Sequence, residues 1–240
     1  MSLFDFSYTP TKAIIALTSK FASELPRLQA VSLVLAYQHS LTDEELADLS
    51  SRLWLGIRNL KQISLTFCEI SLNAAALKHI MSIPLNPKFK ALETLSLNFF
   101  QCQFLSNKFI TKLGENICQN LVKLKKLYLN LVPIPASYPI LGGLKAFFDI
   151  EGISNKGLVQ FGKILERRGM SNLELISLCI EQSPQISDVG VKKFCDKIEG
   201  IKGLERVFLK FRLCHKVTCK AKEYMEERFG NAKKGKLELI

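Results

Sequence analysis

Apolar residues recur along the chain at one fixed set of spacings. In residues 60–70 they stand at offsets 0, 3, 5 and 7, followed by a cysteine at offset 8 and an isoleucine at offset 10. The 0-3-5-7 frame begins again at five other residues: Leu28, Leu92, Leu124, Leu173 and Leu204. Because apolar and polar residues alternate from offset 3 to offset 7, each copy predicts a β-strand with one buried face.

Apolar residues at helical spacing follow each predicted strand. A Ser or Thr stands four residues before the first apolar position of most of these segments, where a helix N-cap belongs. The N-cap candidates are Thr42, Ser106, Ser154, Ser187 and, before a last helix, Thr218. Thr42 also has Glu45 three residues later, which predicts a capping box. Residues 14–21 predict an N-terminal helix, and Phe4 and Phe6 predict an extra opening strand before it.

One interval breaks the repeat. Successive copies begin 32 residues apart at 28, 60, 92 and 124, but 49 residues separate Leu124 from Leu173. The stretch Ala146–Ile150 alternates and predicts a degenerate strand in this gap, with Phe147 and Asp149 facing outward. Residues 132–143 contain three prolines within seven residues, so they cannot form the expected helix. The sequence therefore predicts that the fourth repeat has an irregular loop in place of its helix.

A strand and a helix of about 30 residues cannot enclose a core alone, so each unit must be covered by its neighbours. The repeats therefore predict one α/β domain over residues 1–240, a solenoid of about seven to eight units with parallel strands on the concave side and helices on the convex side. Residues 1–27 are expected to cap its beginning and residues 212–240 its end. The final stretch 236–240 reads as a strand, which either closes the edge of the sheet or marks where a longer array continues.

The frame in residues 60–70 resembles the leucine-rich repeat superfamily, in particular its ribonuclease-inhibitor-like, cysteine-containing subtype. Residues 41–45 and 186–190 resemble the segment that leads into the helix of that subtype. The resemblance extends from residue 28 to about 230, with Cys68 alone keeping the Cys/Asn position. It implies a right-handed, horseshoe-shaped solenoid, recognition of proteins on the concave face, and no catalytic set that could be transferred to this chain.

Composition narrows the functional classes. The chain is 48% hydrophobic and 23% charged, which is typical of a globular protein, and no apolar run reaches the length of a membrane span. Seven scattered cysteines, an odd number, favour free thiols and an intracellular location, cytoplasmic or nuclear. The formal net charge is +11, with fourteen basic and eight acidic residues in 186–240. Nothing indicates a signal peptide, a metal, a cofactor or a small-molecule substrate.

Outward residues of the predicted strands supply the candidate site. The earlier strands offer small polar side chains, and the later ones add aromatic and charged residues. The candidate partner-binding residues are Tyr128, Asn130, Phe147, Asp149, Phe208 and Lys210. Aromatic side chains on rigid strands make good anchors for a protein partner. The alternative is that the loop only replaces a lost helix and that the aromatic side chains pack on one another.

The sequence predicts a non-enzymatic scaffold that binds a protein through its concave strands and the proline-rich loop, within a larger complex. No Ser or Cys stands at motif spacing from a histidine, and no phosphate-binding glycine loop is present. The second hypothesis, from the basic C-terminal half, is a subunit that contacts RNA or DNA through its helical face and its last helix.

Overall fold

A computed structural model describes residues 2–5, 28–36, 59–68, 89–102, 105–133, 152–167, 170–230 and 234–238, together with residues 42, 44, 45 and 48. Within these ranges, strands and helices alternate along the chain. The strands are β1 (Ser2–Asp5), β2 (Ala30–Ala36), β3 (Gln62–Cys68), β4 (Thr94–Cys102), β5 (Lys126–Pro133), β6 (Leu175–Glu181), β7 (Arg206–Arg212) and β8 (Lys234–Glu238). The helices are α4 (Asn107–Asn120), α5 (Asn155–Arg167), α6 (Asp188–Glu199) and α7 (Cys219–Phe229).

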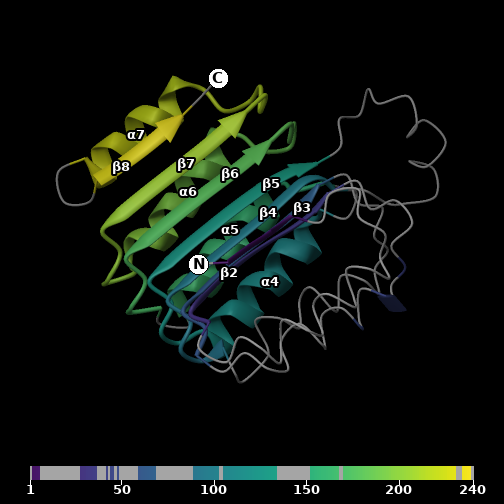
Figure 1. Cartoon of the computed structure of the whole chain (residues 1–240). Helices are drawn as coiled ribbons and strands as arrows, with labels where there is room; N and C mark the ends of the chain where they lie inside the picture. Colours follow the sequence, from purple (N-terminus) through teal and green to yellow (C-terminus); the bar gives the residue numbers. More distant parts are fainter. Residues whose placement is uncertain are drawn as a thin grey trace.

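All eight strands form one parallel sheet whose spatial order is the order of the chain. The sheet is open and is not closed into a barrel, and helices α4 to α7 lie in one layer behind it (Figure 1). Strand β1 confirms the predicted opening strand. Strand β8 confirms the predicted final strand, which begins two residues earlier than expected. An arrangement of this kind, with helices on one side, is compatible with a solenoid-like fold.

The register follows the repeat frame residue by residue. Offset 3 of one unit pairs with offset 3 of the next, and the same holds at offsets 5 and 7. Backbone bonds just before the strands repeat as well: the Lys61 carbonyl accepts from the N–H groups of Glu93 and Thr94, and the Glu93 carbonyl from those of Lys125 and Lys126. Identical units therefore dock with one geometry, which keeps the strands side by side.

The core lies between the sheet and the helices. Residues at offsets 0, 3, 5 and 7 are almost completely buried in the described units, except Leu28 at the start of the first copy, which is partly buried. At offset 7 the Phe67 and Phe99 rings stack with centroids 5.4 Å apart, and Phe109 of α4 meets the Phe99 ring edge-on at 5.2 Å. In the helix layer Phe161 and Phe194 stack at 6.3 Å. The aromatic rings thus join neighbouring units as well as the two layers.

Helix starts agree with the sequence. Ser106, Ser187 and Thr218 are N-caps, and the Ser106 and Thr218 side chains accept bonds from Phe109 N–H and Lys220 N–H. The predicted capping box is also confirmed, because Thr42 N–H donates to the Glu45 carboxylate and Glu45 N–H donates to the Thr42 hydroxyl. These short local bonds satisfy N–H groups that a helix leaves unpaired at its start.

The prediction that residues 146–150 form a strand between those at 124–131 and 173–180 is wrong. Strand β5 pairs directly with β6, with Tyr128 opposite Ser177, and the Lys125 carbonyl accepts from the N–H groups of Glu174 and Leu175 as in every other unit. No strand therefore separates β5 from β6. The fourth repeat was expected to lack its helix, but helix α5 follows β5 and serves as the helix of this unit. The extra residues are an insertion between a strand and its helix; residues 134–151 lie outside the described part.

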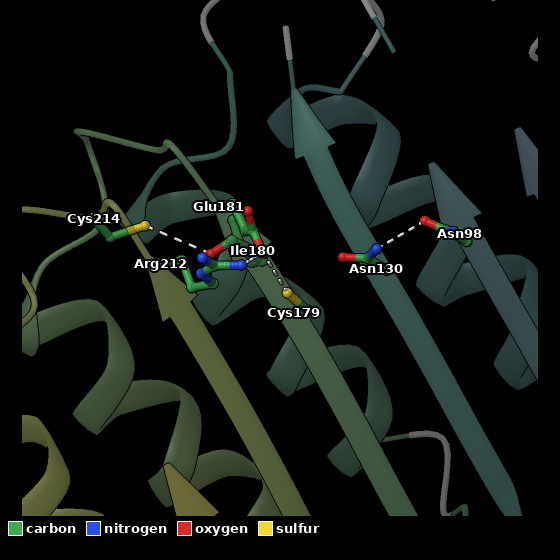
Figure 2. Close-up of polar contacts among 7 residues, drawn as sticks. All are labelled: Asn98, Asn130, Cys179, Ile180, Glu181, Arg212 and Cys214. Carbon is green, nitrogen blue, oxygen red and sulfur yellow. Dashed lines mark hydrogen bonds and ion pairs between the residues drawn. The ribbon is translucent and has the colours of Figure 1, made fainter. Parts of the chain in front are cut away.

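Two cysteines are buried at offset 10, whereas Cys68 at offset 8 is half-buried. Cys102 Sγ donates to the Phe67 carbonyl at 3.5 Å. Cys214 Sγ donates to the Ile180 carbonyl at 3.6 Å (Figure 2). The residue before each has a left-handed backbone, with φ of 53° at Gln101 and 54° at Leu213. This kink turns offset 10 inward, onto the neighbouring unit.

Side-chain hydrogen bonds link the start of each of the helices α4, α5 and α6 to the start of the next helix. The first residue of each helix reaches the N-cap of the next unit. Asn107 Oδ1 accepts from Ser154 N–H and Oγ and from Gly157 N–H, and Asn155 Oδ1 accepts from Ser187 N–H at 2.9 Å. Asp188 repeats the arrangement with N–H and Oγ1 of the following N-cap, Thr218, both at 2.7 Å. Each unit therefore caps the helix of the unit that follows it.

Candidate functional site

The face of the sheet that lies away from helices α4 to α7 is the candidate site, and we call it the open face. No helix of the described residues lies on it (Figure 1). The outward residues expected from the alternation are half-buried or exposed in every described strand, while their neighbours along the strand are buried. The prediction of which side chains point outward is confirmed for these strands.

Two aromatic side chains of the open face lie in one lateral row. Tyr128 of β5 pairs in register with Ser177 of β6, and Ser177 pairs with Phe208 of β7. Two strand spacings, about 10 Å, separate the two aromatic residues. Phe208 is 37% exposed, so part of its ring is available to a partner. The small Ser177 lies between the two aromatic residues.

Two cations occupy the next lateral row. Lys126 precedes Tyr128 by two residues on β5, and Arg206 precedes Phe208 by two residues on β7; Leu175 of β6 lies between them in register. Within the described part of the chain neither cation forms an ion pair. Strands β5 and β7 thus each present a cation and then an aromatic ring, about 7 Å apart along the strand.

On the other side of the aromatic row the side chains are polar. Asn130 Nδ2 donates to Asn98 Oδ1 at 2.8 Å, and the Asn130 oxygen, which points toward β6 in Figure 2, is buried without a hydrogen-bond partner among the described residues. Its register neighbour is Cys179, whose thiol donates to Glu181 Oε1 at 3.6 Å. Burial, reinforced by the Glu181 charge, raises the pKa of Cys179 to about 12, so this thiol stays protonated at neutral pH.

At the carboxyl ends of the strands, Glu181 and Arg212 form an ion pair with 3.7 Å between Oε1 and Nη1 (Figure 2). Lys210 lies between Phe208 and Arg212 on the outward side of β7. The open face of β5, β6 and β7 therefore holds four basic side chains and one acidic one. The basic residues are Lys126, Arg206, Lys210 and Arg212.

The helix layer is balanced in charge. Helices α6 and α7 contain six basic and six acidic residues. Arg228 pairs with Glu199 at 3.0 Å and with Asp196 at 3.6 Å, and Tyr224 donates its hydroxyl hydrogen to Asp196. This hydrogen bond raises the pKa of Tyr224. In this part of the chain the excess of positive charge is therefore on the open face.

Four of the six predicted site residues lie on the described open face: Tyr128, Asn130, Phe208 and Lys210. Phe147 and Asp149 lie outside the described residues, as does most of the proline-rich segment. Because β5 pairs with β6, Tyr128 and Phe208 are one strand closer than the expected strand order would put them. Sequence reasoning missed Lys126 and Arg206. Both could have been predicted from the sequence, because a residue at offset 2 points to the same side of the strand as the residues at offsets 4 and 6.

The described residues also bear on three other features: a metal centre, a membrane-spanning helix and a disulfide. No group of three or more His, Cys, Asp or Glu side chains among them is placed to hold a metal ion. Among the same residues, no helix is long and apolar enough to cross a membrane. All seven cysteines are free thiols, and Cys214 is buried whereas Cys219 is exposed.

Comparisons with known proteins identify no family for the chain. No protein-family model matches the chain, and no curated protein matches it. Among solved structures, the chain is similar to a crystal structure of a Bacteroides fragilis protein from a structural genomics consortium, at 13% sequence identity and a TM-score of 0.40. The similarity covers 99% of this chain and 73% of that one. At this level the likeness names no family and suggests no activity.

Proposed function

We propose that the chain is a non-enzymatic, leucine-rich-repeat interaction module that binds a protein partner through its open face. The observation that carries the proposal is a regular row of outward side chains, with Tyr128 on β5 and Phe208 on β7 on either side of β6 and all described helices on the opposite side. Parallel sheets are normally covered on both faces. A sheet with one such face uncovered offers a broad surface for a partner.

Several features support the finer assignment to a leucine-rich-repeat solenoid of the ribonuclease-inhibitor-like kind. Each of the four units that begin with β4 to β7 consists of one strand and one helix, and these units repeat their backbone bonds, N-caps and buried offset-10 residues. Stacking of such units curves the sheet, because helices are wider than strands, and this would place the open face on the concave side of a right-handed arc. We expect about seven to eight units.

A binding role fits the chemistry of the open face better than catalysis does. Its one central thiol, Cys179, has a pKa of about 12 and donates a hydrogen bond to a carboxylate, so it is not a nucleophile at neutral pH. The other central groups are serine and asparagine side chains. A rigid aromatic pair beside uncharged polar groups is instead typical of the anchor region of a protein interface.

Contact with nucleic acid through the helical face is the second hypothesis from the sequence. The ion pairs between α6 and α7 oppose it, because they leave no net positive charge on these two helices. Salt separates the two hypotheses: nucleic-acid binding should weaken steeply between 50 and 200 mM salt, by roughly a thousandfold for six phosphate contacts. A contact anchored by aromatic side chains should weaken far less.

The test places a photo-crosslinking amino acid at Ser177 on the open face or, as a control, at Lys156 on helix α5, whose side chain is exposed. In an extract of the source cells, the Ser177 probe should form a protein adduct and the Lys156 probe should not. Combining the Ser177 probe with Phe208→Ala should remove the adduct. An adduct that forms equally from Lys156, or that survives Phe208→Ala, contradicts binding at the open face.

A further inference from the structure

We propose that the partner of the open face is an extended acidic segment of a protein, held with one carboxylate between Lys126 and Arg206 and with an aromatic or leucine side chain between Tyr128 and Phe208. This inference rests on the proposed function and specifies its ligand. It follows from how the two lateral rows are aligned across three strands.

The alignment defines where a chain would lie. Strand β6 presents small outward side chains, Ser177 and Cys179, between larger ones on β5 and β7. A segment laid along β6 would have strands β5 and β7 on its two sides. In an extended segment, side chains two residues apart point the same way and lie about 7 Å apart. This is the spacing between the cation row and the aromatic row.

The rows match two kinds of side chain in the ligand. Lys126 and Arg206 flank Leu175 in register, so a group bound at this row meets two positive charges. A carboxylate suits this place, since Arg and Lys both donate charge-assisted hydrogen bonds to it. Tyr128 and Phe208 flank the small Ser177, so a ring or a leucine of the ligand over Ser177 would contact both aromatic side chains. The recognised pattern is an acidic residue two positions from an apolar one, in either chain direction.

Charge complementarity selects an acidic protein over other occupants. Lys126 and Arg206 lack acidic partners among the described residues, whereas Arg228 of α7 is paired with Asp196 and Glu199 of α6. A nucleic acid needs cations along its whole backbone. Toward β4 and β3 the open face carries Thr94, Ser96 and Asn98 instead, and Glu181 stands at the end of β6. The positive charge of the open face thus lies on β5 and β7 and does not continue along β4.

The experiment begins with random decapeptides displayed on phage and selected on the full chain, with counter-selection on the Tyr128→Ala/Phe208→Ala variant. We expect enrichment of Asp or Glu two positions from Phe, Tyr, Trp or Leu. Selected peptides that are neutral or basic would overturn the acidic assignment and leave the proposed function standing. Failure to retain any peptide in preference to the variant would count against both.

The second measurement is fluorescence anisotropy with the best selected peptide. Lys126→Glu/Arg206→Glu should weaken binding about tenfold or more, and Lys126→Gln/Arg206→Gln by a smaller factor. The matched control is Lys108→Glu/Lys156→Glu, which makes the same charge change at exposed positions of the helix layer and should leave binding unchanged. Equal weakening by both Glu pairs would overturn the proposed site, because it would show a dependence on net charge alone.

Two controls complete the measurement. Circular dichroism of each variant must match the wild type, and the milder Gln pair supplies the result if the Glu pair does not fold. Decauridine RNA, added as a competitor, should not displace the peptide at equal concentration. Displacement by the RNA would overturn the proposal in favour of a nucleic-acid ligand.

Discussion

Gly190, in the first turn of helix α6, is the position where helix propensity and the repeat geometry make opposite predictions. Alanine is favoured over glycine inside a helix by about 1 kcal/mol. At Gly190, however, an added Cβ would collide with the Asn155 carboxamide, with its Cγ only 2.6 Å away. Asn155 is not free to move without cost, because its amide donates to Ser187 Oγ at 2.8 Å and its oxygen accepts from Ser187 N–H.

These effects give an expected free-energy change for Gly190→Ala. Displacing Asn155 removes two hydrogen bonds, worth about 1 kcal/mol each. Overpacking at a tight contact adds about 1 kcal/mol or more. After the gain in helix propensity is subtracted, the free energy of unfolding should fall by about 2 kcal/mol. Urea denaturation followed by circular dichroism measures this change as a shift of the midpoint at constant slope.

The chain provides a matched control at Gly200, at the end of the same helix. Its φ is −66°, and the nearest atom to an added Cβ is a Glu166 carboxylate oxygen at 3.5 Å. Gly200→Ala should therefore raise the free energy of unfolding by about 0.4 to 1 kcal/mol. In an Asn155→Ala background, Gly190→Ala should cost less than about 1 kcal/mol, since the carboxamide is gone. Stabilisation by Gly190→Ala alone, equal to that of Gly200→Ala, would refute the reasoning.

Three further outcomes are expected. Phe194→Ala should lower the free energy of unfolding by about 3 to 5 kcal/mol in the same urea assay, because the ring is fully buried against the neighbouring helix; a loss below 1 kcal/mol would contradict the packing. At pH 8 a thiol reagent should label the exposed Cys219 and leave Cys195 unmodified in the native protein, as measured by mass spectrometry. The reason is that burial raises the pKa of Cys195 to about 12. Rapid labelling of Cys195 would refute its burial. The hydrogen bond and charge of Lys125 lower the pKa of Glu93. The stability that Glu93 contributes is therefore present above its unfolded-state pKa and is lost as the pH falls through the lower folded-state pKa. Carboxyl-carbon NMR titration should show a midpoint below 4.5 for Glu93 that rises in Lys125→Met, and an unchanged midpoint would exclude the ion pair.

The strand register could be predicted because it depends on strictly local alternation within each repeat. The same local reasoning failed for residues 146–150. A five-residue alternation such as Ala146–Ile150 says nothing about whether the sheet has room for another strand. The loop-closure free energy grows slowly with length, so an insertion between β5 and α5 costs little. Spacing alone could not distinguish such an insertion from an extra unit.

The buried cysteines at offset 10 could not be predicted for a different physical reason. The sequence frame puts the Cys/Asn position at offset 8, but the strands of this chain continue to offset 8 and kink at offset 9. Gln101, Gln182 and Leu213 adopt positive φ there, and none of them is a glycine that would mark the kink in advance. The tertiary contact of the offset-10 side chain with the preceding strand fixes this conformation, and a single sequence does not show it.

The open face was partly predictable. Tyr128 and Phe208 stood out as aromatic residues at outward positions. The outward positions used for the candidate site were offsets 4 and 6. Lys126 and Arg206, at offset 2, lie on the same side of their strands and were not included. Their register, which puts both beside Leu175, depends on the pairing of β5 with β6 across the insertion. That pairing is a long-range contact, and only the three-dimensional structure reveals it.

The bonds between helix starts give the array a polarity. Asn107 satisfies N–H groups that belong to the following unit, and Asn155 and Asp188 do the same for the units that follow them. Removing a unit from the carboxyl-terminal end therefore leaves a side-chain oxygen that water can solvate. Removing one from the amino-terminal end leaves main-chain donors of the next helix without their acceptor. A chain made in this order can use each finished turn as the template for the one still emerging from the ribosome.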